Sequence, residues 1–247
     1  MKLLSINQDS KTIKGLEKGY LTGIMYLAPY TLGGKNICPF AKAAGCIDAC
    51  LNTAGRGIFN NVQQARLNRT KLFHNDINAF MNKLAFEIHA LKKTAIKNGL
   101  IPVIRLNGLS DIEYENIKFD HYDRFIGFNY QSITIFELFP DIQFYDYTKN
   151  PNRDNLPKNY DLTFSYSNKP EFQKFNEIAI KKGMRLAAVF SDKNLPAYFM
   201  GLPVLNGDES DLTFLAPKNT ILGLYAKGKA KKDTSGFIIK TIPILAI

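Results

Sequence analysis

Long apolar runs and cysteines are scarce in this chain of 247 residues, and each scarcity excludes a class of protein. No run approaches the roughly 18 apolar residues that a membrane-spanning helix requires. The opening MKLLSINQDSKTIKG has only a short apolar patch and no cleavage site after it, unlike a secretory signal. Three cysteines are too few, and odd in number, for a disulfide framework. The sequence therefore predicts a cytoplasmic protein without a membrane partner.

Several signatures of common enzyme classes are also missing. The chain has no Walker loop, no G-x-S-x-G elbow, no HExxH helix and no dinucleotide-binding G-x-G-x-x-G. Hydrophobic residues make up 45% and charged residues 22%, which is typical of a folded globular protein. Any catalytic or binding site must therefore be built from other residue patterns.

The charge balance favours a polyanionic partner. Lys and Arg number 32 against 22 Asp and Glu, which gives a formal net charge of +10. Such an excess attracts nucleic acids and nucleotides, and the basic loop Lys227–Lys232 is a candidate for phosphate contact. The alternative is a basic surface that is only solvated, and the sequence leaves both interpretations open.

Seven short apolar segments rich in β-branched or aromatic residues predict strands. Several are continuously apolar, which is typical of parallel strands covered on both faces. Helical patterns lie between them, at 62–73, at about 76–98 and at 172–182. Residues 125–139 could form a helix or a strand, and we expect them to be buried in the core in either case. We expect a single α/β domain with a parallel-stranded partial (β/α) barrel, the alternative being an open sheet. The predicted strands are 23–29, 101–106, 142–148, 161–166, 185–190, 202–205 and 220–226.

Polar side chains gather just after these strands, where parallel α/β folds place their active face. We expect them to line the mouth of the barrel. Arg105 lies inside an apolar run and needs a partner if it points inward; Asp146 is a candidate for that partner or for a general base. The predicted substrate site comprises Arg105, Asn107, Asp146 and Lys149, and Asp111 and Asp208 are predicted to bind a cofactor.

The three cysteines are close together in the sequence, with the spacing C-x7-C-x3-C. Cys38, Cys46 and Cys50 follow the first predicted strand directly and precede the first long helix. Three thiolates can hold three irons of a 4Fe-4S cluster and leave the fourth iron open to a substrate or to S-adenosylmethionine. Cys46 and Cys50 are four residues apart, a spacing that suits one face of a helical turn. Gly55 and Arg56 come next, as a cofactor-binding element or a simple turn.

Two alternatives remain open for the cysteines. Structural zinc usually takes four ligands in paired short spacings, and this chain has no C-x2-C pair. His74 is a remote candidate for a fourth ligand, whereas His89 and His121 show no metal-binding spacing. The other alternative is that the thiols are simply buried, since cysteine is often a core residue.

The position of the cysteine segment resembles that of the cluster loop in radical S-adenosylmethionine enzymes, which follows the first strand of a partial (β/α)6 barrel. Their usual spacing is C-x3-C-x2-C, which this chain lacks. Asn107 and Gly108 are only a loose counterpart of their glycine-rich segment. The resemblance therefore concerns layout and implies a similar fold and cofactor.

A second resemblance extends over most of the chain. The segments that carry it look like the phage "gene product 88" family, whose function is uncharacterised. This resemblance implies a phage or plasmid setting, hence the cytoplasm of a host cell, and nucleic-acid metabolism as the context. The segments are GYLTGIMYLAP, CPFAKAAGCIDACLNTAGRG, NVQQARLNRTKLF, RLNGLSDI, FPDIQFYDYTKNPNR, YDLTFSYS, LNGDESDLTFLAPK and AKGKAKKDTSGF.

Three functional hypotheses follow. The first is an iron–sulfur enzyme, similar to radical S-adenosylmethionine enzymes, that acts on a nucleic acid or nucleotide. The second is a metal-stabilised DNA- or RNA-binding protein without catalysis, in phage replication or regulation. The third, a metal-free protein that engages a host protein, has no positive support in the sequence.

Overall fold

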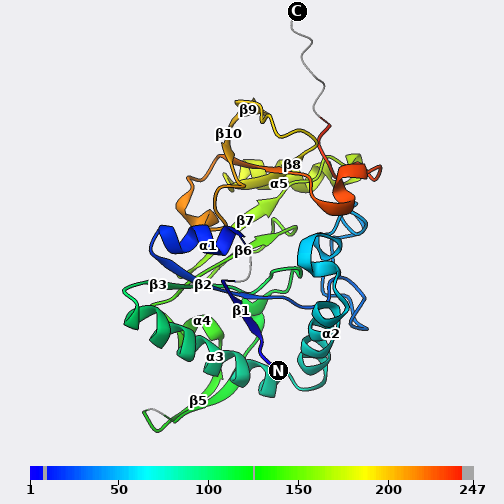
Figure 1. Ribbon diagram of the computed structural model, residues 1–247. Helices are drawn as coiled ribbons and strands as arrows, with labels where there is room; N and C mark the ends of the chain where they lie inside the picture. Colours follow the sequence, from blue (N-terminus) through cyan, green and yellow to red (C-terminus); the bar gives the residue numbers. More distant parts are fainter. Residues whose placement is uncertain (8–9, 125, 241–247) are drawn as a thin grey trace, which may run out of the picture. The chain divides into compact units, whose positions relative to one another are not determined.

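The computed structural model describes residues 1–7, 10–124 and 126–240, and shows an α/β protein (Figure 1). Hydrogen-bonded neighbours in the main sheet follow the order β1-β2-β3-β6-β7-β8-β11-β10-β9, and β4 and β5 form a separate hairpin. The pairs β2–β3, β3–β6, β7–β8, β8–β11 and β10–β11 are parallel, whereas β1–β2 and β9–β10 are antiparallel. The described sheet is therefore large and mostly parallel.

The chain divides into two compact units, and each is described by itself. Unit 1 contains residues 1–38, 59–146 and 153–161, and unit 2 contains residues 39–58, 147–152 and 162–247. The expectation of a single domain stays a prediction.

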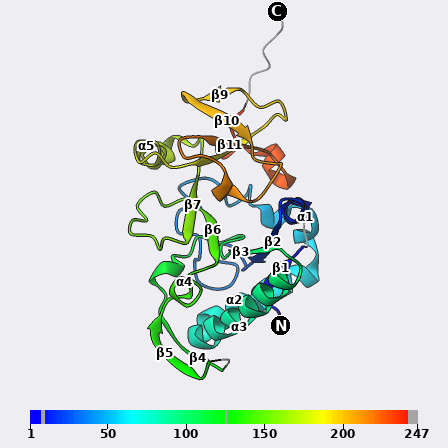
Figure 2. The ribbon, with the colours of Figure 1, turned by 90° about the vertical axis from the view of Figure 1, so that its left-hand side faces the viewer.

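Unit 1 places helices against a short parallel sheet. Its strands are β1 (Leu4–Ile6), β2 (Tyr20–Met25), β3 (Ile101–Arg105) and most of β6 (Gln143–Thr148), with the hairpin β4 (Phe119–Asp123) and β5 (Phe128–Ile133). Its helices are α1 (Ser10–Glu17), α2 (Asn60–Asn75), α3 (Ile77–Lys97) and the short α4 (Ile135–Leu138). Figure 2 shows α2 and α3 side by side, with the β4–β5 hairpin below them.

Helix α3 packs closely on the sheet of unit 1 because its apolar residues recur at helical spacing. Its buried face is Phe80, Met81, Leu84, Ala85, Ile88, Leu91 and Ala95. A Cβ at Gly23 of β2 would stand 2.6 Å from Leu91 Cδ1, so the helix approaches the strand where there is no side chain. The Asp76 side chain accepts a hydrogen bond from the Ala79 N–H and caps the start of the helix.

Unit 2 carries most of β7 (Tyr160–Ser165), then β8 (Leu186–Phe190), β9 (Tyr198–Phe199), β10 (Leu202–Asn206) and β11 (Ile221–Tyr225), with helix α5 (Gln173–Lys181). Short 3-10 turns include η1 (Leu51–Thr53), η2 (Gly55–Ile58) and η6 (Gly228–Lys232). Its core is built from Phe164, Phe172, Leu186, Ala188, Phe190 and Ile221. The part of the cysteine segment that lies in unit 2 packs on this core through Ala44, and Ala49 packs in a second cluster with Ala226, Ala230, Phe237 and Ile238.

All seven predicted strands and all three predicted helices are present, with bounds shifted by a few residues. No closed barrel forms in the described part of the chain, where the sheet has β1 and β9 at its ends. The expectation of buried core at 125–139 is wrong for β5, since Phe128 is 55% exposed, but holds for Ile135 and Phe136. Residue 125 lies outside the described residues.

Among the described helices, none combines the length and apolarity needed to cross a membrane.

Candidate functional site

In unit 1, predicted residues from two neighbouring strands meet in a buried polar network. Asn107 follows β3, and its backbone N–H donates to Asp146 Oδ1 at 2.7 Å. Its side chain holds the next turn, donating to the Ile112 carbonyl while its Oδ1 accepts from Ser110 Oγ and the Ile112 N–H. The parallel pairing of β3 with β6 brings these groups to the same edge of the sheet.

Asp146 is completely buried, and its contacts are all within the protein. The Tyr160 hydroxyl donates to Asp146 Oδ2 at 2.9 Å, and Arg105 exerts an electrostatic attraction on the carboxyl. Burial raises the pKa of Asp146 to about 7, although Arg105 and the hydrogen bonds from Asn107 and Tyr160 oppose the rise. The structure therefore gives Asp146 a positioning role toward Asn107, and a general-base role stays a prediction.

Arg153 closes the network on its other side. Its guanidinium donates to both oxygens of Glu115 and to the Tyr160 hydroxyl, and its Nη1 lies 3.6 Å from Asp111 Oδ1. Nothing in the sequence indicated that Arg153, Tyr160 and Glu115 belong to this network. They lie in the loop 150–159, in a strand and in a short turn, and no spacing in the sequence links them.

Cys38 lies in unit 1, against the turn that follows β3. Its Sγ accepts a hydrogen bond from the Tyr30 N–H at 3.3 Å, and its S–H donates to the Leu109 carbonyl oxygen at 3.4 Å. The same turn reaches the end of β2, where the Gly108 N–H donates to the Met25 carbonyl and a Cβ at Gly108 would stand 2.6 Å from that oxygen. Cys38 is therefore held at the carboxyl ends of parallel strands.

Cys46 and Cys50 lie in unit 2. The segment around them is held by hydrogen bonds to its backbone carbonyls, from Ser167 Oγ to Ala44 at 2.7 Å and from Ser235 Oγ to Gly45 at 2.6 Å. Because Ser167 follows β7, this segment too lies near the carboxyl end of a strand. The expected helical turn at Cys46–Cys50 is absent: these residues form bends and turns, and Cys50 caps η1.

All three cysteines are half-buried thiols, so the inert, fully buried state is not observed. The Cys50 sulfur accepts a hydrogen bond from the Asn52 N–H, as the Cys38 sulfur does from Tyr30, whereas the Cys38 and Cys46 thiols donate to the carbonyls of Leu109 and Ala41. Sulfur donors suit a soft metal. Among the described residues, however, the group of three ligand atoms that lie within 4.8 Å of one another contains no cysteine.

The remaining predicted residues lie in unit 2 and have structural contacts. The buried Lys149 ammonium donates to the carbonyls of Ser165 and Tyr166 and lies 4.4 Å from the Phe237 ring centroid. Asp208 accepts from the Tyr225 N–H and pairs with Lys227 at 2.7 Å. Gly55 and Arg56 are exposed in η2. None of these contacts tests the predicted roles in substrate or cofactor binding.

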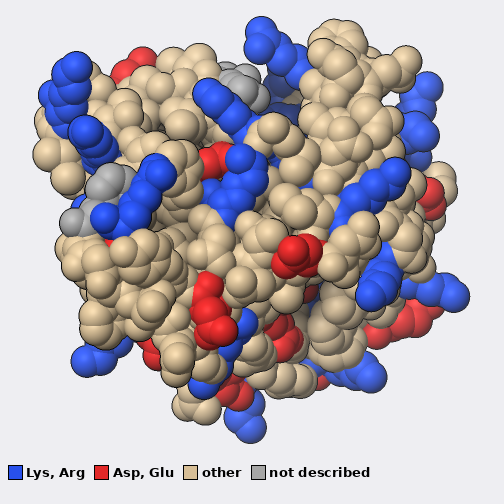
Figure 3. Space-filling view, turned by 90° about the horizontal axis from the view of Figure 1, so that it is seen from below, with Lys and Arg blue, Asp and Glu red and all other residues tan. Residues whose placement is uncertain are grey.

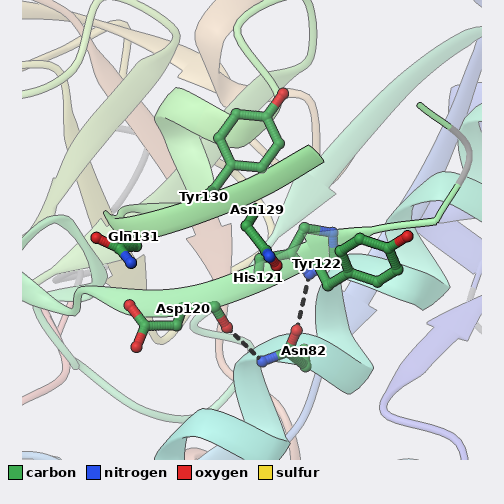
Figure 4. Close-up of a pocket in the computed structure, with 7 residues that line it drawn as sticks. All are labelled: Asn82, Asp120, His121, Tyr122, Asn129, Tyr130 and Gln131. Carbon is green, nitrogen blue, oxygen red and sulfur yellow. Dashed lines mark hydrogen bonds between the residues drawn. The ribbon is translucent and has the colours of Figure 1, made fainter. Parts of the chain in front are cut away.

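Among the described residues, each unit has a pocket of about 440 Å³. The pocket in unit 2 is lined by Asp48 and Ala49 of the cysteine segment and by Lys229, Lys232, Asp233, Thr234 and Ser235 of the basic loop and its continuation. The pocket in unit 1 lies beside the β4–β5 hairpin and is lined by Asn82, Asp120, His121, Tyr122, Asn129, Tyr130 and Gln131 (Figure 4).

Fold and site together describe an α/β protein with a polar network at the carboxyl ends of its parallel strands and thiols beside them. The chain belongs to the gene product 88 family, whose model matches residues 2–241. This match confirms the resemblance seen in the sequence. Neither a curated protein nor a solved structure matches the chain.

Proposed function

We propose that this chain is an iron–sulfur enzyme of a phage or mobile element that acts on a nucleotide or nucleic acid. Cys38, Cys46 and Cys50 would supply three thiolates to a 4Fe-4S cluster. The observation that carries the proposal is the position of the cysteine segment. In unit 1 Cys38 contacts the turn after β3, and in unit 2 Ala44 accepts from a residue that follows β7. Carboxyl ends of strands are where parallel α/β folds carry out their chemistry.

The strand order of unit 1 supports a partial (β/α) barrel of the kind found in radical S-adenosylmethionine enzymes, since its parallel strands β2, β3 and β6 are neighbours in chain order. In unit 2 β11 pairs in parallel with both β8 and β10, so the order β7-β8-β11-β10 departs from chain order. Barrels have strands in chain order, whereas a doubly wound sheet reverses its order at a switch point.

The chain's own residues would hold and orient the reactants. The Tyr30 N–H stabilises the Cys38 thiolate, and the Asn107–Asp146 pair fixes the turn whose Leu109 carbonyl contacts that sulfur. A bound cluster with one open iron would supply electrons and a binding position for S-adenosylmethionine. The buried network rigidifies this turn, which favours precise positioning of a substrate.

A phosphate-bearing substrate suits the pocket of unit 2. Lys229 and Lys232 are exposed and line it together with Asp48 and Ala49, which lie between the second and third cysteines in the sequence. Lysine ammonium groups bind phosphate as point charges, and the net charge of +10 would attract polyanions over longer range.

The decisive experiment is anaerobic purification followed by iron, sulfide and zinc analysis with an absorption spectrum. We expect about four irons and four sulfides per chain. Cys38→Ser, Cys46→Ser and Cys50→Ser should each lose them, whereas Met200→Ser, which removes an exposed sulfur outside the cysteine segment, should retain them. A protein without iron would overturn the proposal. If the reduced holoprotein neither binds nor cleaves S-adenosylmethionine, the radical mechanism is excluded.

A second candidate, a DNA- or RNA-binding protein with a structural metal, is favoured by the exposed lysines of η6 and its flanks. Lys227, Lys229, Lys231 and Lys232 are all exposed. Elsewhere the charges are mixed: on the face in Figure 3, Lys and Arg side chains stand at many separate points with Asp and Glu between them. This candidate predicts a metal without redox chemistry and binding that weakens steeply with salt.

A further inference from the structure

Two histidines and an aspartate converge in unit 1, away from the cysteines in the sequence. His89 lies on α3, and His121 and Asp123 lie on β4. Each offers one ligand atom, and the three atoms lie within 4.8 Å of one another. His89 Nε2 and Asp123 Oδ2 are 3.7 Å apart, which is too long for a good hydrogen bond. Two ligands of a tetrahedral zinc ion stand roughly 3.3 Å apart, given metal–ligand distances of about 2.0–2.1 Å.

The alternation of β4 presents the two strand residues on one face. Phe119, His121 and Asp123 are buried, whereas Asp120 and Tyr122 between them are exposed. Helix α3 packs on β4 and brings His89 to the buried face. Aromatic rings surround the group: Phe139 lies 4.8 Å from the His89 ring, and Phe119 and Tyr130 lie near the His121 ring.

Asn82 fixes the orientation and the tautomer of His121. The Asn82 Nδ2 donates to the carbonyls of Asn78 and Asp120, at 3.0 and 2.8 Å, so its Oδ1 must face the other way. That oxygen lies 2.8 Å from His121 Nδ1 (Figure 4). Since Oδ1 only accepts, Nδ1 carries the proton and Nε2 keeps its lone pair. Metal-binding histidines typically donate their second ring N–H in this way.

The surroundings of the two imidazoles disfavour their charged form. Burial lowers the pKa of His89, although Asp123 opposes the shift. Burial also lowers the pKa of His121, again against the attraction of Asp123. Asp123 itself is buried, at 7% exposed.

We propose that His89, His121 and Asp123 bind a divalent transition-metal ion, of which zinc is the first choice. Two imidazoles and one carboxylate are a known zinc ligand set that leaves the fourth position to water. The ion would link the β4–β5 hairpin to α3, because its ligands come from both elements. This site is independent of the proposed cluster, because it shares no ligand with the cysteines.

Titration of the metal-free full chain with Zn²⁺ and Co²⁺ tests the site. We expect one ion per chain at this site. The Co²⁺ spectrum should have d–d bands and no thiolate charge-transfer band. The Cys38→Ser variant should give the same spectrum. His89→Gln and Asp123→Asn should lose that ion. The matched controls His74→Gln and Asp120→Asn should retain it, since His74 and Asp120 lie outside the group. Equal binding by His89→Gln and His74→Gln would overturn the proposal.

A second variant keeps the test decisive if removal of a ligand unfolds the chain. Asn82→Ala leaves all three ligands in place and removes the group that orients His121, together with the hydrogen bonds from Asn82 to the Asn78 and Asp120 carbonyls. We expect zinc affinity to fall about 10- to 100-fold, as it does when other second partners of metal-bound histidines are removed. A zinc-dependent rise in Tm should shrink in parallel. Unchanged affinity in Asn82→Ala would count against the site.

Discussion

The buried carboxyl group of Asp146 holds neighbouring strands together by hydrogen bonds. Its carboxyl accepts from the Asn107 N–H and the Tyr160 hydroxyl, and these contacts join β3, β6 and β7 within unit 1. Removing a carboxylate from water is costly, so such a group persists only where hydrogen bonds and nearby cations compensate. Arg105 and Arg153 supply that positive charge.

The buried state of Asp146 makes a prediction for the pH dependence of stability. Its pKa rises from 3.8 to about 7 on folding, so the folded state holds more protons than the unfolded state between these values. This contribution to stability is full below pH 4 and falls as the pH rises to about 7, by at most about 1.4 kcal/mol per pH unit. Asp146→Asn cannot titrate and removes this slope.

Urea denaturation of both proteins from pH 4 to pH 8 measures the effect. The stability of the wild type minus that of Asp146→Asn should decline toward pH 7 and be constant above it. Taking the difference cancels the other titrating groups. A difference that is constant over the whole range would mean that Asp146 keeps an ordinary pKa in the fold.

At the scale of elements, the parallel strands were predictable and the β4–β5 hairpin was not. Several of the predicted strands, such as β8, are continuously apolar because both of their faces are covered, so composition alone indicates them. β4 reads Phe-Asp-His-Tyr-Asp, and β5 is mostly exposed, so neither carries an apolar signal. The pairing of His89 with β4 depends on how α3 packs, which no spacing in the sequence encodes.

The start of α3 offers a test of local stability. Asp76 accepts from the Ala79 N–H at 2.8 Å, which satisfies a donor that the helix itself leaves without an acceptor. Asp76→Ala should lower the free energy of unfolding by about 1 kcal/mol, within a range of about 0.5–2. Thermal or urea unfolding gives this value directly.

The matched control is Lys93→Ala, on the exposed face of the same helix. Surface substitutions of this kind usually change stability by less than about 0.5 kcal/mol. Equal effects of the two substitutions would show that the cap does not stabilise α3.

At the scale of the whole molecule, the sequence predicted the α/β class and the strand ends where polar residues gather. It predicted the convergence of Asn107 with Asp146, because Asn107 follows β3 and Asp146 lies in the neighbouring parallel strand β6. It did not predict the contacts of Lys149, whose ammonium binds backbone carbonyls, since a buried lysine and a substrate-binding lysine look alike in sequence. The division of the chain between Cys38 and the other two cysteines was likewise not readable.

The net charge of +10 is also a property of the whole molecule, and salt separates its two interpretations. If phosphates bind at the pocket of unit 2, Lys229 and Lys232 each release about one counterion. Lys229→Gln/Lys232→Gln should then weaken binding to labelled double-stranded DNA and reduce the slope of log affinity against log salt by about two. Lys93→Gln/Lys97→Gln on α3 removes the same charge from another exposed surface and should leave that slope nearly unchanged. Fluorescence anisotropy between about 50 and about 200 mM salt measures both. Identical slopes in the two double variants would mean that the positive charge acts only through the general field of the protein and that the pocket holds no phosphate.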